Sequence, residues 1–358
     1  MQVSILGAGG VAYSYAAFLA SRGHEPTVWS PSGKRACELR SGMKLTASNA
    51  LDGSFAVGVA TSEAQATEAD VLILAVPAYG YRAVLDRILP ILRDGQTLII
   101  SAHLSFAALY LSRRLSERGI DCPIVVWNTT ASTGRQTGPA NVSVSLLRAK
   151  VEMAVIPDTA GAKALALCQE LFGDRFALVS DMIGVDLGNL NPAVHYGIAM
   201  FNLTRMELAE DWPQQAHITP AVARFLEDLD RERLALANAF GVQARSIHQA
   251  YAVPGKIEIA PLAEMMRNIV ATRKGVNGPK SLDTRYVTED VPYGLLTTIR
   301  LAEMTGVEVP LHRAGVTVFS SLYGRDFTAE NTILPEIAPA FASVDKLRAA
   351  LRNGWSAV

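Results

Sequence analysis

The spacing of hydrophobic and polar positions changes about halfway along the chain. In the first half, short apolar runs alternate with segments whose apolar residues recur at helical spacing. From about Ile183 onward the pattern is mostly helical, with long amphipathic stretches such as Pro220–Phe240. Strand–helix alternation predicts right-handed βαβ units and a doubly wound parallel sheet. We therefore expect an α/β domain over residues 1–182 and an all-α domain over residues 183–358.

The individual elements of the first domain can be predicted from these runs. The run Val71–Val76 is continuously apolar, which is typical of a parallel strand covered on both faces. We predict strands at Val3–Leu6, Thr27–Trp29, Val71–Val76, Thr97–Ser101, Pro123–Trp127, Val142–Leu146, Glu152–Val155 and Phe176–Val179. We predict helices at Gly10–Arg22, Ser32–Arg40, Tyr81–Leu92, Phe106–Arg118 and Gly161–Phe172. A length of 358 residues also favours two domains over one.

Composition and charge exclude several classes of partner and location. Lys and Arg number 33 and Asp and Glu 34, a net charge of −1, which argues against a surface that binds nucleic acid or anionic lipid. No segment resembles a signal peptide, and no apolar run is long enough to span a membrane. The three cysteines lie far apart without metal-like spacing, so we expect neither a disulfide framework nor a metal site. These features predict a cytoplasmic protein.

A glycine-rich segment joins the first predicted strand to the first predicted helix. Gly7-Ala8-Gly9-Gly10-Val11-Ala12 fits the pattern G-x-G-x-x-A. In this context the first glycine permits a tight turn, the second lets the backbone approach a pyrophosphate, and the small sixth residue allows the helix to pack closely on the strand. The motif could be a tight turn alone, but its position between strand and helix favours a dinucleotide-binding Rossmann domain. Pro77, at the end of the third predicted strand, completes the expected cofactor-binding edge.

The end of the second predicted strand bears on the choice between NAD and NADP. An acidic residue there would bind the ribose 2′-hydroxyl of NAD. This chain has no carboxylate at that point; instead it offers two hydroxyls and two cations, on Ser30, Ser32, Lys34 and Arg35. These groups suit a 2′-phosphate, although they could also be the solvated first turn of a helix. We expect NADPH to be preferred, with NAD possible.

Two polar clusters in the second half are candidates for catalysis. Of the six histidines, His195 lies at the start of an apolar helix, in the segment Asn189–Tyr196, whereas His103 follows the predicted strand Thr97–Ser101 and remains a weaker candidate. A lone histidine in such a helix is more often structural than catalytic. The second cluster, Asp283–Val291, contains Arg285, which could clamp a carboxylate with two parallel hydrogen bonds. Asp290 could orient a histidine or simply cap the next helix, and spacing alone leaves both roles open.

Four segments together resemble the opine dehydrogenases of the octopine/nopaline type, over nearly the whole chain. They are GAGGVA at Gly7–Ala12, NLNPAVH at Asn189–His195, ITPAV with LDRERLALANAFGV at Ile218–Val222 and Leu229–Val242, and DTRYVTEDV at Asp283–Val291. The resemblance implies a catalytic pair of His195 and Asp290 and a substrate-binding Arg285. We assign Asn191 and Tyr196, which flank His195, to the substrate-binding set as well.

The resemblance also implies a reaction. An amino acid and a 2-oxo acid, for which pyruvate is our candidate, would condense to an imine that NAD(P)H reduces to a secondary-amine dicarboxylate. His195 would be the general acid and base, Asp290 would fix its tautomer and raise its pKa, and relatives suggest a homodimer. Two alternatives stay open. One is a ketopantoate- or hydroxy-acid-type reductase using Lys256, Lys274 or Lys280; the other is a non-catalytic NADP-binding regulator.

Overall fold

The computed structural model describes residues 1–255, 257–272 and 276–358. The chain divides into two compact units, Met1–Val185 with Glu336–Val358 and Asp186–Pro335. The sequence-based ranges placed all residues after 182 in the helical domain. The structure instead returns the C-terminal segment to the first unit, because its helix α17 (Val344–Asn353) buries Leu347, Ala350 and Leu351 there.

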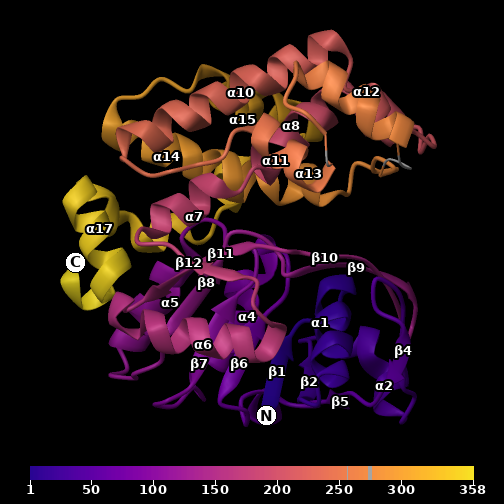
Figure 1. Ribbon diagram of the computed structural model, residues 1–358. Helices are drawn as coiled ribbons and strands as arrows, with labels where there is room; N and C mark the ends of the chain where they lie inside the picture. Colours follow the sequence, from indigo (N-terminus) through magenta and orange to yellow (C-terminus); the bar gives the residue numbers. More distant parts are fainter. Residues whose placement is uncertain (256, 273–275) are drawn as a thin grey trace. The chain divides into compact units, whose positions relative to one another are not determined.

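The first unit is built on an eight-stranded sheet of order β12-β11-β8-β7-β6-β1-β2-β5 (Figure 1). Neighbouring strands are parallel except β8 and β11, which pair antiparallel. The chain passes from β1 to β2 on one side and then to β6 on the other, so the order reverses beside β1. The strands are β1 (Gln2–Leu6), β2 (Glu25–Trp29), β5 (Gly58–Val59), β6 (Val71–Leu74), β7 (Thr97–Ile100), β8 (Ile124–Trp127), β11 (Val151–Ile156) and β12 (Phe176–Leu178).

A second, four-stranded sheet in this unit was not predicted from the sequence. Its order is β4-β3-β10-β9, and its strands are β4 (Gly53–Phe55), β3 (Leu45–Asn49), β10 (Asn141–Leu147) and β9 (Ser132–Gly138). Val142–Leu146, predicted as a strand, therefore belongs to this second sheet. The sheet as a whole was not predicted because its other three strands, β9, β3 and β4, are rich in polar residues and glycine and give no apolar run.

Helix α1 (Gly10–Ser21) contacts strands of both sheets. It buries residues on all sides, including Tyr13, Tyr15, Phe18 and Leu19, which explains why its sequence is apolar throughout rather than amphipathic. The other helical elements of the unit are η1 (Lys34–Ala36), α2 (Cys37–Arg40), α3 (Glu63–Ala66), η2 (Ala78–Gly80), α4 (Tyr81–Ile88), α5 (Ala107–Ser116), η3 (Asp158–Ala160), α6 (Gly161–Phe172) and η7 (Trp355–Ala357). The single helix expected over 32–40 is thus split into η1 and α2.

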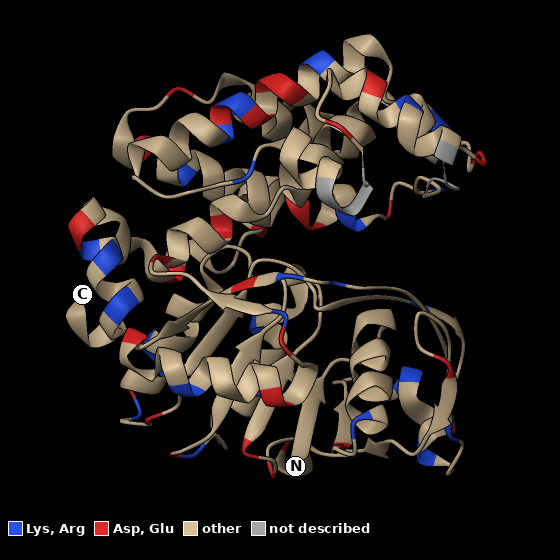
Figure 2. Ribbon diagram, in the orientation of Figure 1, with Lys and Arg blue, Asp and Glu red and all other residues tan. Residues whose placement is uncertain are grey.

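The regular elements of the second unit, among its described residues, are helices (Figure 1). Its elements are α8 (Asn191–Phe201), α9 (Leu203–Glu207), η4 (Gln215–His217), α10 (Pro220–Ala239), α11 (Ile247–Gly255), α12 (Leu262–Thr272), α13 (Arg285–Thr288), η5 (Val291–Leu295), α14 (Leu296–Thr305), α15 (Pro310–Tyr323) and α16 (Phe327–Glu330). Helices α7 (Met182–Gly188) and η6 (Leu334–Ala342) carry the chain out of the first unit and back. Basic and acidic residues are interspersed along these helices (Figure 2).

The charges of the segment LDRERL in α10 have a structural role. Asp230 and Arg233 are both buried and form an ion pair with an N–O distance of 2.6 Å. Asp230 also accepts a hydrogen bond from the backbone of Ile247 at 2.8 Å, and Arg233 donates to the carbonyl of Arg245 at 2.6 Å. The pair therefore ties α10 to the loop that follows it.

Candidate active site

The glycine-rich loop has the geometry that a close ligand approach requires. Gly7 follows β1 with φ of +151°, and a Cβ there would lie 2.4 Å from the carbonyl oxygen of Ala75. Gly9 directly precedes α1, and the space above it is open apart from an Arg35 nitrogen 3.7 Å from the ideal Cβ position. The backbone N–H groups at the start of α1 can therefore bind an anion. The loop lies where the strand order reverses beside β1, the usual dinucleotide position of such sheets.

The side chains of the other residues of the motif pack the loop and leave its backbone N–H groups available to a ligand. Ala8 and Ala12 are buried, and Val11 packs against the core of the first unit. Gly10 allows β9 to approach, because a Cβ on it would lie 2.3 Å from the carbonyl oxygen of Gly134. Gly10 is therefore small because it lies against the second sheet, a reason that the motif by itself does not reveal.

The end of β2 presents polar groups in agreement with the sequence prediction. The hydroxyl oxygen of Ser30 is buried and has no hydrogen-bond partner among the described residues. Ser32, Lys34 and Arg35 are exposed, and the backbone carbonyl of Arg35 accepts a hydrogen bond from Tyr13 at 2.5 Å. A buried hydroxyl without a partner costs free energy unless a ligand satisfies it. These residues fit the adenosine end of a nicotinamide cofactor.

Two cations near this strand end were missed from the sequence. Arg40 donates a hydrogen bond of 3.3 Å to the carbonyl of Gly33, and the guanidinium of Arg87 lies 5.5 Å from the ring centroid of Trp29. Arg87 also bonds Glu63 at 2.6 Å, so its charge is partly neutralised. No sequence signal placed Arg87 here, because it comes from α4. Pro77 lies exposed just after β6, at the same end of the sheet.

The helical unit brings His195 and Asp290 together. His195 lies on α8, Asp290 directly precedes η5, and the distance between Nδ1 and Oδ2 is 2.7 Å. The two residues are 7% and 3% exposed. Since a carboxylate can only accept, Nδ1 carries a hydrogen, and Nε2 remains the atom for proton exchange. Nε2 has no hydrogen-bond partner among the residues that the structure describes.

Arg285 and Tyr286 complete this cluster. Arg285 is exposed, its guanidinium makes no hydrogen bond or ion pair with a described residue, and it lies near enough to influence the pKa of His195. The ring of Tyr286 stacks on the imidazole with centroids 3.7 Å apart and planes inclined by 6°. Sequence reasoning missed Tyr286, although its place directly after Arg285 in the same motif was a signal.

The pKa of His195 results from opposing influences. Burial lowers it most, the carboxylate of Asp290 raises it through charge and hydrogen bonding, and the positive charge of Arg285 lowers it. The net direction is downward from 6.5. Asp290 thus raises the pKa of His195, as the resemblance implied, but burial outweighs the carboxylate and the net shift is downward.

The other residues assigned to substrate binding have different surroundings. Asn191 precedes His195 by four positions on α8 and therefore shares its face of the helix. Tyr196 is 2% exposed and donates a hydrogen bond of 3.3 Å to the carbonyl of Leu311. Burial and the nearby Glu232 raise its pKa to about 12. Tyr196 is a core residue and does not join the His195 cluster.

The weaker candidates are structural or not described. His103 is fully buried, and its Nε2 accepts a hydrogen bond from the backbone of Ala108 at 3.1 Å. Lys280 is exposed and paired with Asp211. Lys256 and Lys274 lie outside the described residues.

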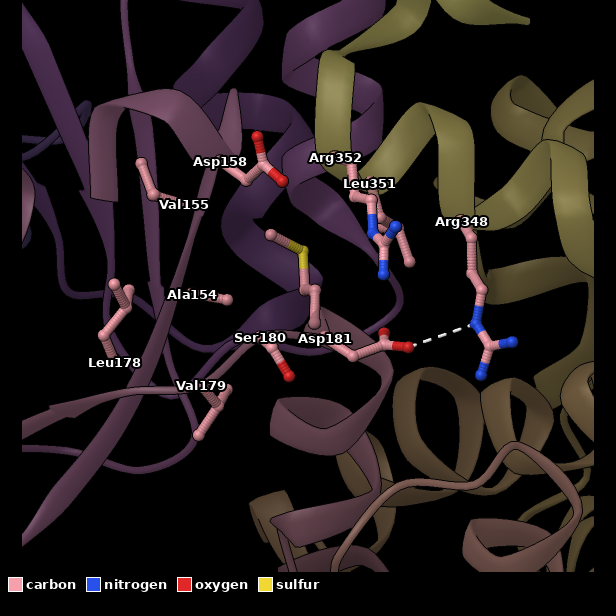
Figure 3. A pocket seen from close by; sticks show the side chains of 11 residues that line it. Ala154, Val155, Asp158, Leu178, Val179, Ser180, Asp181, Arg348, Leu351 and Arg352 are labelled. Atoms are coloured by element: carbon pink, nitrogen blue, oxygen red, sulfur yellow. Dashed lines mark hydrogen bonds and ion pairs between the residues drawn. The ribbon is translucent and has the colours of Figure 1, made fainter. Parts of the chain in front are cut away.

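A pocket of about 380 Å³ lies elsewhere in the first unit (Figure 3). Its walls are formed by β11, the segment after β12 and helix α17, and it contains Asp181, whose carboxylate accepts a hydrogen bond of 3.2 Å from Arg348. None of the predicted site residues lines it. Within the described part of the chain, no cluster of His, Cys, Asp or Glu could hold a metal ion, and no helix has the length and hydropathy to cross a membrane.

Two parts of the chain match two different protein families. Residues 178–323 match the family described as NAD/NADP octopine/nopaline dehydrogenase, α-helical domain. Residues 3–103 match the ketopantoate reductase family PanE/ApbA. The first match contains His195, Arg285 and Asp290, and the second contains the glycine-rich loop.

Relatives of known name match nearly the full length. An opine dehydrogenase of Arthrobacter sp. (strain 1C) is 27% identical over 97% of this chain and 98% of its own. The protein ocs of Agrobacterium tumefaciens (strain Ach5) is 26% identical over 91% of this chain and 92% of its own. An octopine dehydrogenase in complex with NADH and agmatine has the same fold, with a TM-score of 0.78 and 17% identity over 97% of this chain and 98% of its own.

Proposed function

We propose that this chain is an opine dehydrogenase acting on an amino acid and a 2-oxo acid. The match of residues 178–323 to the octopine/nopaline dehydrogenase family supports the proposal. We propose pyruvate as the oxo acid and NADPH as the preferred reductant. The observation that carries this proposal is the buried His195–Asp290 pair beside the exposed cation of Arg285, which forms no ion pair with a described residue. That cluster combines a proton-transfer group with a carboxylate-binding group, which the condensation of two carboxylate-bearing substrates requires.

In this proposal His195 is the general acid and base, and it donates and accepts the proton at Nε2. When an amine adds to a keto carbonyl and water leaves, a proton must reach the departing oxygen, and the protonated imidazole can supply it from Nε2. Asp290 keeps hydrogen on Nδ1, so Nε2 alone faces the reaction and the imidazolium is stabilised by a charged hydrogen bond of 2.7 Å. In the reverse direction the neutral imidazole takes the proton back at the same atom.

Arg285 binds and orients a substrate. Its guanidinium can hold a carboxylate by two parallel hydrogen bonds, which fix a plane as well as a position. Fixing that plane determines which face of the imine is presented for reduction. Asn191, on the same face of α8 as His195, would add a neutral hydrogen bond to the substrate.

The first unit supplies the cofactor site in this proposal. The loop Gly7–Val11 would hold the pyrophosphate at the start of α1, Pro77 would line the same strand edge, and Ser30, Ser32, Lys34 and Arg35 would bind the 2′-phosphate. When bound, the nicotinamide supplies the hydride. A yersinopine dehydrogenase, solved with NADP⁺ bound, shares the fold with a TM-score of 0.68 and 17% identity over 100% of this chain and 99% of its own. That structure supports the proposal because a protein of this fold binds NADP⁺.

The test is a matrix of amino acids against 2-oxo acids in which NADPH oxidation is followed at 340 nm. We expect oxidation only when both substrates are present, and a secondary-amine dicarboxylate as the product by mass spectrometry. Oxidation with the oxo acid alone would refute the proposal. It would favour a ketopantoate- or hydroxy-acid-type reductase, the second candidate, for which the match of residues 3–103 is the specific observation.

We further propose a homodimer in the cytoplasm. The presence of free cysteines at Cys37, Cys122 and Cys168 supports a reducing compartment. Light scattering coupled to size-exclusion chromatography tests the dimer, and a mass near 38.4 kDa would refute it.

A further inference from the structure

Two groups restrain the imidazole of His195, one at its edge and one at its face. Asp290 holds the edge through Nδ1 at 2.7 Å. Tyr286 covers one face, with ring centroids 3.7 Å apart and planes inclined by only 6°. Aromatic rings pack most often in offset or edge-to-face arrangements with centroids 4.5–7 Å apart. The contact between these two rings is therefore unusually close and flat.

The phenol ring is itself held in place. Its hydroxyl donates a hydrogen bond of 2.7 Å to Oε1 of Gln214, a side chain whose residue is 6% exposed. The backbone N–H of Gln214 donates to the carbonyl of Val276 at 2.8 Å, and the N–H of Val276 donates to Oε1 of Gln215 at 2.9 Å. Trp212 adds a bond of 3.0 Å to the carbonyl of Pro279. Two loops, 212–215 and 276–279, thus anchor the phenol that lies on His195.

We propose that Tyr286 is a positioning residue for the His195–Asp290 pair, a role that rests on the function proposed above. Its anchored ring fixes the plane of the imidazole and thereby the direction in which Nε2 exchanges a proton. The face of a phenol carries partial negative charge, so the same ring stabilises the imidazolium over the neutral imidazole. Tyr286 needs no contact with substrate for either effect.

The surroundings of His195 show why such a group is useful. The charged groups that influence it are Asp290, which favours the imidazolium, and Arg285, which disfavours it. The neighbouring helix α10 presents Phe225 and Leu226 to α8, both apolar, near Gly197. Burial and one cation thus oppose protonation, while one carboxylate and one aromatic face support it.

The experiment compares Tyr286→Leu, Tyr286→Phe and Gln214→Leu by kcat, KM and the pH dependence of kcat. Tyr286→Leu removes the aromatic face, so we expect kcat to fall about ten- to thirtyfold, KM to change less than about threefold, and the His195 limb to move to lower pH. Tyr286→Phe keeps the face and should restore most of kcat. Tyr286→Phe and Gln214→Leu break the same hydrogen bond, so their effects should not add.

Tyr323 provides the matched control. It is a tyrosine of the same unit whose hydroxyl donates to the carbonyl of Leu282 at 3.0 Å, and it makes ring contacts with Phe319 and Phe327 rather than with His195. Tyr323→Leu should lower thermal stability but leave the pH limb unmoved. If Tyr286→Leu keeps wild-type kcat and pH limb, or if both leucine variants lower kcat alike without moving the limb, the proposal is overturned.

Two further outcomes separate this proposal from the one it rests on. Full kcat in His195→Ala would refute the acid–base role itself, whatever Tyr286 does. If Tyr286→Leu does not fold, the pair Tyr286→Phe and Gln214→Leu decides, because additive effects on kcat would exclude a shared anchor.

Discussion

At the scale of single residues, the chemistry depends on a contact between positions 95 residues apart. His195 and Asp290 are both buried, so neither is readily hydrated when its partner is lost. Removing His195 would leave the buried Asp290 carboxylate without its hydrogen-bond donor, and leaving a buried polar group unpaired costs about 1–3 kcal/mol or more. Variants that test the pair should therefore keep its shape where possible.

His195→Ala tests the proton-transfer role. General acid–base groups typically contribute about 10²–10⁴-fold to rate, so kcat should fall by that factor. The NADPH dissociation constant, measured by fluorescence titration, should stay within about twofold, since His195 lies in the helical unit and the cofactor loop does not. His24→Ala, which alters a turn after α1, serves as the control with unchanged kcat.

The lowered pKa of His195 predicts the pH dependence. In the reductive direction His195 must be protonated, so kcat should decline as pH rises through a pKa below 6.5; in the oxidative direction kcat should rise through the same pKa. Asp290→Asn removes the influence that raises this pKa, so both limbs should move to lower pH. If Asp290→Asn leaves a limb of the pH profile in place, that limb does not report the titration of His195.

The lowered pKa of His195 also makes the stability of the fold depend on pH. Because the pKa of His195 is lower in the folded chain, the unfolded chain binds this proton more readily. The contribution of His195 to the free energy of unfolding is therefore complete above about pH 6.5 and is lost as the pH falls below that value.

Arg285→Lys tests carboxylate binding. The substitution keeps the charge but loses the two-pronged geometry, and a hydrogen bond to a charged group is worth about 1.5–3 kcal/mol. KM for the oxo acid should therefore rise at least about tenfold, with KM for NADPH unchanged. A rise confined to NADPH would make Arg285 a phosphate-binding residue instead.

At the scale of elements, the proposed preference for NADPH depends on the turn η1. Lys34 and Arg35 are exposed, and Arg35 reaches over Gly9 from outside α1. Two screened charge contacts of about 1 kcal/mol each correspond to roughly thirtyfold in affinity. We expect kcat/KM to favour NADPH over NADH by about one to two decades, less so at high ionic strength.

The double variant Lys34→Ala with Arg35→Ala should remove most of that preference by weakening NADPH alone. Arg93→Ala is the matched control, because Arg93 pairs with Asp70 at 2.8 Å just before β6, at the opposite end of that strand from the cofactor loop. Wild-type preference for NADH, or an unchanged preference in the double variant, would show that the two cations only solvate the turn.

At the scale of the whole molecule, both ends of the chain belong to one unit. The chain leaves the first unit after Val185 and returns at Glu336, so the helical unit is an insertion between two parts of the first. Helix α17 packs against β11 and η3, and η7 against α5. Arg113 donates a hydrogen bond of 2.5 Å to the carbonyl of Glu336 where the chain returns.

Leu351→Ala should therefore destabilise the cofactor-binding unit. Leu351 is 4% exposed, and truncating a buried leucine costs about 2–5 kcal/mol. In urea unfolding, the transition that NADPH stabilises should move to lower urea. Arg352→Ala, on the exposed side of the same helix, should change stability by less than about 0.5 kcal/mol. Equal effects of the two variants would contradict this packing.

The sequence by itself determined the features that depend on neighbours along the chain. The loop Gly7–Ala12, the strand before it, the helix after it and the long helix Pro220–Ala239 follow from local spacing, because backbone geometry ties each pattern to one element. The position of Tyr286 directly after Arg285 could also have identified Tyr286 as a candidate site residue. The resemblance to a family supplied the pairing of His195 with Asp290, which no local spacing contains.

Only the tertiary structure decided which buried groups meet. The second sheet lies against α1 through β9, where Gly10 and Gly134 approach closely, a contact that spans more than a hundred residues and leaves no periodic pattern. Tyr196 and His195 are adjacent in sequence, yet one is committed to the core and the other to Asp290, since successive helix positions point about 100° apart. The direction of the His195 pKa shift likewise came from burial, which depends on the packed fold and not on the order of residues.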